Sequence, residues 1–275
     1  LSLDEKAKKL DVRYTAEGTL WKMGVMFQLS VELYDMKSSK IIWSDRWEES
    51  WDNLTTIKGN LSDGLLKALG TTSRIIKHVE TFDTGAYEYY LKGKYKFEKQ
   101  SSKKDLIIAR NLLNKSIEKD CNLLEAKNLL AETYIRTTNY ETAIKILEET
   151  LRESEELNDS FNIAYSLCLL GFSYDWIGVN NEKILPYYKR ALSISKKIDD
   201  NHAISNCLQE LTSYYAKRCD LNKWSDYNKK SYLLLKKLGD KKSISMNLMG
   251  ESEILILQGE YLDSIETMKK AYKIG

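Results

Sequence analysis

The 275-residue chain has little proline, cysteine or histidine, and each shortage excludes a class of protein. One proline and thirteen glycines are too few for a collagen-like or a low-complexity disordered chain. The four cysteines, Cys121, Cys168, Cys207 and Cys219, form no C-x-x-C pair, which argues against a zinc site and against a disulfide framework. We interpret all four as small, reduced core residues of a cytoplasmic protein.

Long hydrophobic runs and an excess of one charge are also missing. No stretch reaches the roughly 18 uninterrupted apolar residues that a membrane span requires, so no membrane partner is expected. Lysine and arginine number 42 against 40 aspartate and glutamate, a net charge of +2. The chain as a whole therefore has no strong positive electrostatic potential to attract nucleic acid, and nucleic-acid binding is disfavoured.

The sequence contains none of the motifs that cradle phosphates, hold a catalytic zinc or position a nucleophilic serine. The two histidines, His78 and His202, lie in a connector and at the start of a helix, so neither anchors a mechanism. We therefore interpret this chain as non-catalytic and expect no metal and no cofactor.

Between Val12 and Glu49 the hydrophobic pattern has period two. Three segments rich in aromatic and β-branched residues are separated by turns at 22–25 and 37–40, which predicts a three-stranded antiparallel meander. On the middle strand we place Phe27, Leu29, Val31 and Leu33 on a buried face and Gln28, Ser30, Glu32 and Asp35 on a wet face. Helices at 3–10 and 53–69, the second capped by Asp52 or Asn53, are expected to cover the buried face.

From about Asp83 the period becomes helical and a repeat appears. A column of small residues holds Thr150, Ala191, Ser231 and Ala271 at spacings of 41, 40 and 40. A column of large residues holds Tyr134, Tyr174, Tyr215 and Leu255 at spacings of 40, 41 and 40. With an earlier degenerate copy, this predicts a mainly α protein with a solenoid of about five helix pairs behind a small α+β unit. The expected boundaries are 1–75 for the α+β unit, 76–85 for a connector, and 86–122, 123–159, 160–200, 201–240 and 241–275 for the repeats.

At these columns the chain resembles the tetratricopeptide repeat (TPR) family. Its pattern of small and large residues is matched by Gly171, Tyr174, Gly178, Ile184, Tyr188 and Ala191, and more loosely by Ala131, Tyr134, Ala143, Leu147 and Thr150. The resemblance implies a superhelix that recognises a protein or peptide ligand on the first helix of each pair.

Residues 1–75 carry a second resemblance. The segments 10–14, 17–20, 28–35 and 42–47 are similar to the second half of a TolB-like amino-terminal domain. In that family such a domain precedes TPR arrays, downstream of an adenylate/guanylate cyclase or a winged-helix domain. The resemblance implies that this chain is the regulatory part of a longer signalling protein, and that the first strand and helix of the domain lie upstream of Leu1.

Counting from the small-residue columns gives the positions expected to line the ligand groove. They lie on the first helices of the second to fifth pairs: Asn128, Glu132, Arg136, Phe172, Asp175, Gln209, Ser213, Met249 and Glu253. The lysine and asparagine set that clamps a terminal carboxylate in some TPR proteins is not reproduced, because Cys168, Gln209 and Met249 occupy the key column. An amphipathic or extended peptide is therefore favoured over a terminal carboxylate.

A basic pattern recurs every forty residues along the second helices, at Lys189, Arg190, Lys229, Lys230, Lys269 and Lys270. We expect these six residues, here called the basic stripe, to form either a solvated outer face or a surface for an acidic protein partner.

Two main functions remain open from the sequence, beside a weaker third, a small-ligand site at the junction of sheet and solenoid, where the tryptophans of residues 43–51 cluster. The first is a non-catalytic scaffold for protein–protein interaction and signal transduction, acting for an upstream effector domain. The alternative is a homodimerisation module in which the ends of the repeat array meet, since Ile265, Met268 and Tyr272 stay apolar on the last helix.

Overall fold

The computed structural model describes residues 5, 7–8, 12–50, 53–70, 83–178 and 181–274. Most of the predicted helix at 3–10, most of the predicted connector at 76–85 and His78 lie outside these residues. The chain divides into two compact units. One consists mainly of the sheet and the helix that follows it, the other mainly of the helical array, and the first two helices of the array contribute to both.

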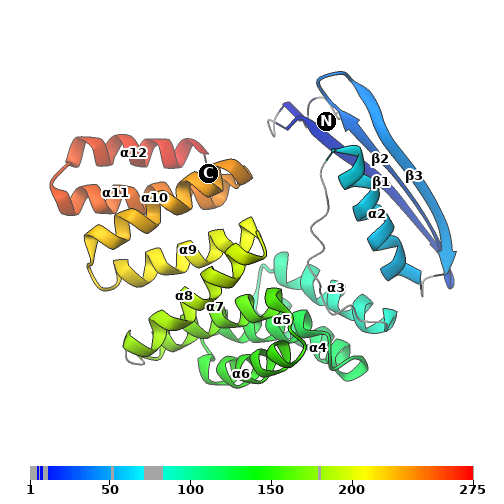
Figure 1. Cartoon of the computed structure of the whole chain (residues 1–275), viewed down its shortest axis with the longest axis horizontal. Coiled ribbons are helices and arrows are strands. Elements are labelled where there is room, and N and C mark those ends of the chain that lie inside the picture. The colour runs from blue at the N-terminus through cyan, green and yellow to red at the C-terminus, as the bar shows by residue number, and fades with distance from the viewer. Residues whose placement is uncertain are drawn as a thin grey trace. The chain divides into compact units, whose positions relative to one another are not determined.

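The sheet is the antiparallel meander that the sequence predicts. Strands β1 (Tyr14–Met23), β2 (Met26–Asp35) and β3 (Lys40–Ser50) lie in the order β1-β2-β3 (Figure 1). The turn between β1 and β2 needs only Gly24 and Val25, because Gly24 adopts the left-handed conformation with φ of +61°. β1 is almost wholly exposed along its length.

One face of β2 is buried, but the sequence prediction placed the last residue of this strand, Asp35, on the opposite face. Phe27, Val31 and Leu33 are buried as predicted, whereas Leu29 is half-buried. Asp35 belongs to the same face and is buried too, because its carboxylate accepts a hydrogen bond from Arg13 Nη2 at 3.0 Å. An ion pair therefore replaces an apolar residue at this end of the face.

Helix α2 (Leu54–Ala68) packs against β3. A Cβ atom on Gly64 would lie 2.6 Å from the ring of Trp43, so only glycine allows this approach. Asn53 is the N-cap residue, but its side chain makes no capping hydrogen bond and donates to Glu49 Oε2 instead, at 2.9 Å. The predicted helix is confirmed, while the predicted capping interaction by Asn53 is absent; Asp52 lies outside the described residues.

The remaining described chain forms ten helices, which pair as the sequence predicts. This is a TPR-like α-solenoid of five helix pairs (Figure 1). The pairs are α3 (Thr84–Glu98) with α4 (Lys103–Lys119), α5 (Leu124–Ile135) with α6 (Tyr140–Glu156), α7 (Ser160–Trp176) with α8 (Asn181–Lys197), α9 (Asn201–Ala216) with α10 (Leu221–Leu238), and α11 (Lys241–Gln258) with α12 (Tyr261–Ile274).

Among the described residues, each of the seven turns from α5 to α12 contains one residue in the left-handed conformation. These residues are Thr138, Asn158, Gly178, Asp199, Cys219, Gly239 and Gly259, with φ between 54° and 84°. In five of the turns the next residue is an N-cap whose side chain accepts a backbone N–H: Asn139, Asp159, Asp200, Asp220 and Asp240. In these five turns, two to four residues separate the end of one helix from the start of the next.

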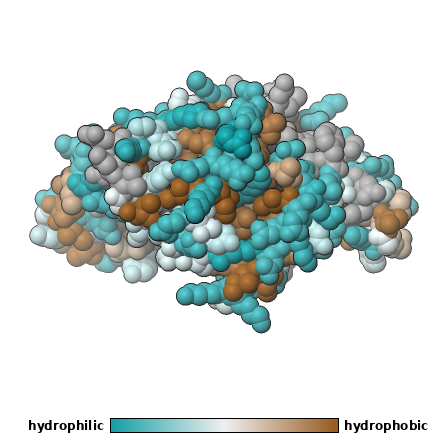
Figure 2. Space-filling model, turned by 90° about the horizontal axis from the view of Figure 1, so that it is seen from below, coloured by the Kyte–Doolittle hydropathy of each residue, from teal (hydrophilic) through white to brown (hydrophobic). Residues whose placement is uncertain are grey.

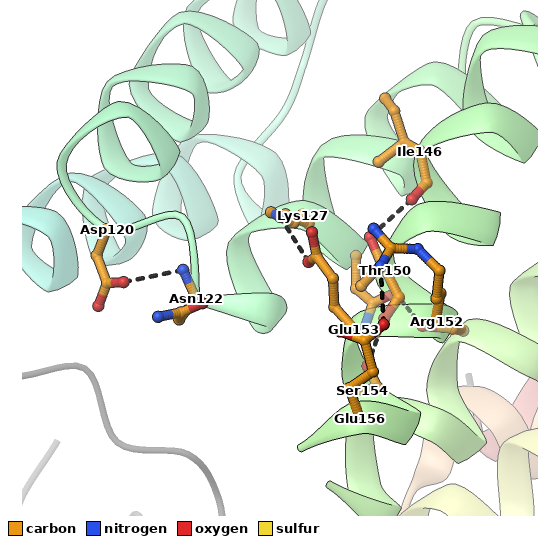
Figure 3. A network of polar contacts seen from close by, with 11 residues as sticks. Asp120, Asn122, Lys127, Ile146, Thr150, Arg152, Glu153, Ser154 and Glu156 are labelled. Atoms are coloured by element: carbon orange, nitrogen blue, oxygen red, sulfur yellow. Dashed lines mark hydrogen bonds and ion pairs between the residues drawn. The ribbon is translucent and has the colours of Figure 1, made fainter. Parts of the chain in front are cut away.

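Small residues lie where neighbouring helices of the array pack closely. Thr150, Ala191, Ser231 and Ala271 are all at most 1% exposed, so the predicted small column is a packing column. A Cβ atom on Gly171 of α7 would lie 2.8 Å from the Tyr188 ring of α8. Figure 3 shows the polar edge of the α5–α6 pair, where Lys127 Nζ reaches Glu153 Oε2 at 2.6 Å.

On the face shown in Figure 2, hydrophobic side chains reach the surface as separate patches bordered by hydrophilic ones. Across the part of the chain that the structure describes, no helix combines the length and the apolar character needed to cross a membrane.

Candidate functional site

Four of the predicted groove residues line one cavity, and the other five do not. The cavity has a volume of about 290 Å³ and lies between α9 and α11, with α10 as its floor; we call it the α9–α11 cavity. Gln209 and Ser213 come from α9, and Met249 and Glu253 from α11. Trp224 and Asn228 of α10 form the floor, and Met246 adds to the α11 wall.

The α9–α11 cavity combines apolar and polar walls. Met249 is 43% exposed and Met246 is 59% exposed, which is unusual for methionine in a folded domain. Ser213 and Glu253 are exposed beside them, and Gln209 is half-buried with its Nε2 3.4 Å from Ser205 Oγ. The cavity can therefore take an apolar side chain and still offer hydrogen bonds and one negative charge at its rim.

Asn128 was predicted to face the groove and is instead fully buried. Its Nδ2 donates to Asn162 Oδ1 at 2.9 Å, and its Oδ1 accepts from Ser166 Oγ at 2.7 Å. Both partners belong to α7, so the amide joins neighbouring helix pairs and is not accessible to a ligand. The prediction for Asn128 is wrong because the next pair covers this position with polar partners.

Glu132 and Arg136 occupy a contact between α5 and its neighbours. Glu132 accepts a hydrogen bond from Tyr165 Oη at 2.6 Å and lies 3.6 Å from Arg136 Nη2. Arg136 itself is exposed and stacks over the Phe97 ring at 5.4 Å. Both side chains are engaged within the protein, although the guanidinium remains open to solvent.

Asp175 connects α7 to the end of α9. Its carboxylate lies 2.8 Å from Lys217 Nζ and 2.7 Å from Arg218 Nη2, and its side chain is only 7% exposed. Burial alone would raise the pKa of Asp175, but hydrogen bonds from both cations outweigh burial and hold that pKa below its usual value. Asp175 thus fixes the spacing of two pairs.

Phe172 belongs to an aromatic cluster at the same edge. Its ring lies 6.4 Å from Tyr140 and 5.9 Å from Trp176, and Lys217 Nζ sits 4.1 Å over the Trp176 ring. Phe172 is half-buried, so it packs the edge of the array and does not line the α9–α11 cavity.

Glu210 is a polar group of this region that the sequence analysis missed. Burial raises its pKa to about 7, Lys217 opposes the shift, and the charges of Asp175 and Glu132 add to it. Glu210 follows Gln209 on α9, and the sequence around it is that of an ordinary helix. Nothing in that sequence indicates that other carboxylates, from distant positions in the chain, lie near the Glu210 carboxylate.

The six residues of the basic stripe are all exposed. Three of them pair with acidic neighbours: Arg190 with Glu155 at 2.6 Å, Lys230 with Asp226 at 2.5 Å and Lys270 with Glu266 at 2.7 Å. Within the described residues, Lys189, Lys229 and Lys269 have no carboxylate within 4 Å. The stripe therefore keeps one unneutralised lysine in each of the last three second helices.

The cysteines divide into two kinds, which corrects the sequence interpretation. Cys168 and Cys207 are buried in the core of the third and fourth pairs, as predicted, whereas Cys121 and Cys219 are exposed in turns. Among the described residues no group of three or more His, Cys, Asp or Glu side chains is placed to hold a metal ion.

No protein-family model matches the chain, and a search of the curated proteins also found no match. Among solved structures it is similar to a Rap protein complexed with Competence and Sporulation Factor, with 15% sequence identity and a TM-score of 0.59 over 78% of this chain. The match spans 58% of the length of that Rap protein.

Two further solved structures are similar to most of the chain. The apo form of RapI has 18% identity and a TM-score of 0.53, covering 82% of this chain and 96% of RapI. A putative kinesin light chain from Podosopora anserina with nearly identical TPR-like repeats has 13% identity and a TM-score of 0.50, covering 68% of this chain and 93% of its own length. At these identities the likeness establishes the fold alone, which is that of a TPR-like helical repeat protein.

Proposed function

We propose that this chain is a non-catalytic recognition module that binds a protein or peptide segment in the α9–α11 cavity. The observation that carries the proposal is the convergence of Gln209, Ser213, Met249 and Glu253 on one accessible cavity. A Rap protein of the same fold, solved with Competence and Sporulation Factor, supports ligand binding by an array of this kind.

The walls of the cavity indicate which segment would fit. Methionine side chains adapt to apolar groups of different shape, so Met246 and Met249 suit a large apolar side chain. Gln209 and Ser213 can bond to a peptide backbone, and the carboxylate of Glu253 favours a neighbouring lysine or arginine. The expected ligand is an extended segment that carries an apolar residue next to a basic one.

The test is selection of random twelve-residue peptides displayed on phage against the immobilised chain. Selected peptides should share an apolar residue beside a basic one, and Met249→Asp and Glu253→Lys should each weaken their binding at least 10-fold. The exposed Lys103 on α4 provides a control, because Lys103→Glu should leave affinity unchanged. Peptides that bind Met249→Asp as tightly as the native chain would contradict the proposal.

We also propose that the sheet and α2 form part of a TolB-like domain, and that the chain regulates an effector domain such as a nucleotide cyclase or a winged-helix domain. The order of three antiparallel strands followed by a helix supports this proposal. Reading the gene upstream of the Leu1 codon tests it, since a catalytic or DNA-binding domain should be encoded there in frame.

Self-association is a second candidate function, and one observation favours it. Helix α12 presents Leu262, Ile265 and Tyr272, which are 83%, 53% and 79% exposed. Apolar side chains of this size are covered in many stable homodimers. Light scattering over a hundredfold range of concentration should show a dimer that Leu262→Glu dissociates, and a monomer at every concentration would exclude this function for the chain.

A further inference from the structure

A second cavity lies on a different side of the last two helix pairs. It has a volume of about 460 Å³ and lies between α10 and α12, with α11 as its floor; we call it the α10–α12 cavity. Asn228 and Asn247 line both this cavity and the α9–α11 cavity, so the contact of α10 with α11 separates the two. Apart from these two asparagines the cavities are lined by different residues, so binding to each can be tested with its own variants.

Apolar side chains form one part of the α10–α12 cavity. Tyr232 and Leu233 project from α10 and Leu248 from α11. Leu233 is 61% exposed, so most of its side chain meets solvent and not the core of the array. The cavity thus offers an apolar surface to a side chain that enters from solvent.

Two members of the basic stripe flank these apolar residues. Lys229 of α10 has no carboxylate within 4 Å among the described residues. Lys270 of α12 contacts Glu266 at 2.7 Å, but both side chains are at least 60% exposed, and such a surface pair adds little and exchanges readily for a new partner. Two cations are thus available on opposite walls of the same cavity.

One carboxylate, that of Glu251, also lines the cavity, so its two lysines and one glutamate leave a net charge of +1. Glu251 Oε2 accepts a hydrogen bond from Asn228 Nδ2 at 3.2 Å. Its other oxygen can accept a backbone N–H, which a peptide supplies and a phosphate backbone does not. The cavity has apolar walls, a carboxylate that accepts hydrogen bonds and one lysine on each of two walls. This combination suits a polypeptide better than nucleic acid, whose binding needs many more phosphate contacts.

We propose that the α10–α12 cavity binds an acidic segment of a partner protein. A large apolar side chain of the segment enters between Tyr232, Leu233 and Leu248, and carboxylates on either side of it contact Lys229 and Lys270. Two residues of the basic stripe, Lys229 and Lys270, line this apolar cavity, and in the complex they would bind the carboxylates of the segment.

The probe is a fluorescein-labelled twelve-residue peptide of glutamate with a central leucine, titrated with the full chain in a fluorescence anisotropy experiment. Two altered peptides separate the contributions: one has serine in place of leucine, and one has lysine in place of each glutamate. The native chain should bind the first peptide at least 10-fold more tightly than either altered one.

Charge reversal on the protein supplies the matched comparison. The double variant Lys229→Glu with Lys270→Glu should lose at least 10-fold in affinity. The double variant Lys189→Glu with Arg190→Glu makes the same charge change in the stripe one pair earlier and should lose less than 3-fold. Leu233→Asp, at an exposed site that does not endanger folding, should also lose at least 5-fold, and circular dichroism should show unchanged helix content in all variants.

Three outcomes would overturn the proposal. Equal losses in the two double variants would mean that the stripe attracts acidic peptides without using the cavity. Binding of a DNA oligonucleotide that is tighter than that of the acidic peptide and is abolished by reversing Lys229 and Lys270 would assign the cavity to phosphate. Absence of binding at millimolar peptide would exclude an acidic segment. The proposed function would be unaffected, because Met249 and Glu253, which test it, do not line the α10–α12 cavity.

Discussion

The side-chain amides of Asn128 and Asn162 meet in the interior of the array, with Asn128 Nδ2 donating to Asn162 Oδ1 at 2.9 Å. Both residues are fully buried, and Asn162 also donates to Asp159, the N-cap of α7. This chain of hydrogen bonds gives each amide oxygen and nitrogen a partner and joins α5 to the start of α7. A buried polar contact of this kind fixes which helices pack together, because a shifted arrangement would leave the amides without partners.

Replacing Asn128 with alanine should lower the free energy of unfolding by about 2 kcal/mol, since Asn162 and Ser166 would both lose a buried partner. Urea unfolding followed by circular dichroism measures this. Asn206 is exposed on α9 and provides the control, so Asn206→Ala should change stability by less than about 0.5 kcal/mol. Equal effects at the two sites would show that the amide contact does not stabilise the array.

The turn between α9 and α10 should become more stable when Cys219 is replaced by glycine. Cys219 holds φ of +54°, a conformation that costs a residue with a Cβ atom about 1 kcal/mol. Gly239 occupies the equivalent left-handed position between α10 and α11 with φ of +71°, so Gly239→Ala should be destabilising by a similar amount. Thermal unfolding of the two variants should shift in opposite directions; a shift of the same sign would refute the explanation.

Gly171→Ala should lower stability by about 1–3 kcal/mol, because the added methyl would lie 2.8 Å from the Tyr188 ring inside a packed pair. Gly250→Ala on α11 is the matched control. Its added Cβ atom would lie 3.4 Å from Asn228 Oδ1, an ordinary contact, and alanine favours the helix by up to about 1 kcal/mol. Denaturant midpoints should fall for the first variant and stay or rise for the second.

Glu210 should make stability depend on pH between about 4.5 and 7. Its pKa is raised to about 7 in the folded chain, so the folded state binds more protons than the unfolded state in this window. The free energy of unfolding should therefore fall as pH rises through the window, by at most ~3 kcal/mol, and level off above it. Asp175 does not contribute there, because its pKa lies below its ordinary acidic value.

Glu210→Gln should remove this slope and exceed the native chain in stability at pH 8, while the two should be similar at pH 4.5. Denaturant unfolding at four pH values is sufficient. A native chain whose stability is constant between pH 5 and 8, or a variant with the same slope, would mean that Glu210 is ionised at its ordinary pKa.

Periodicity was enough to predict the helix pairs, because a packed repeat must place small residues where two helices touch. Ser231 and Ala271 illustrate this, since chemistry and spacing both required them to be buried. Strand pairing followed in the same way from the period of two. Asp35 was assigned to the exposed face because its side chain is charged. The alternation of side chains along the strand places it on the buried face, where the structure has it.

The site was less predictable for a physical reason. Helical spacing tells which face a residue occupies, but not whether the neighbouring pair covers that face. Gln209 and Asn128 occupy comparable predicted positions, yet one borders a cavity and the other is closed in by α7. Likewise Lys229 and Lys230 are adjacent in sequence, yet Lys230 pairs with Asp226 while Lys229 lines the α10–α12 cavity.

The unequal exposure of the four cysteines provides native attachment points for spectroscopy. A maleimide dye should react with Cys121 and Cys219 and spare the two buried thiols, so a donor and an acceptor can be attached without any substitution. One sulfur precedes α5 and the other precedes α10, with two and a half helix pairs between them along the chain. Energy transfer between these dyes would record the coiling and uncoiling of the solenoid as a ligand binds, one molecule at a time.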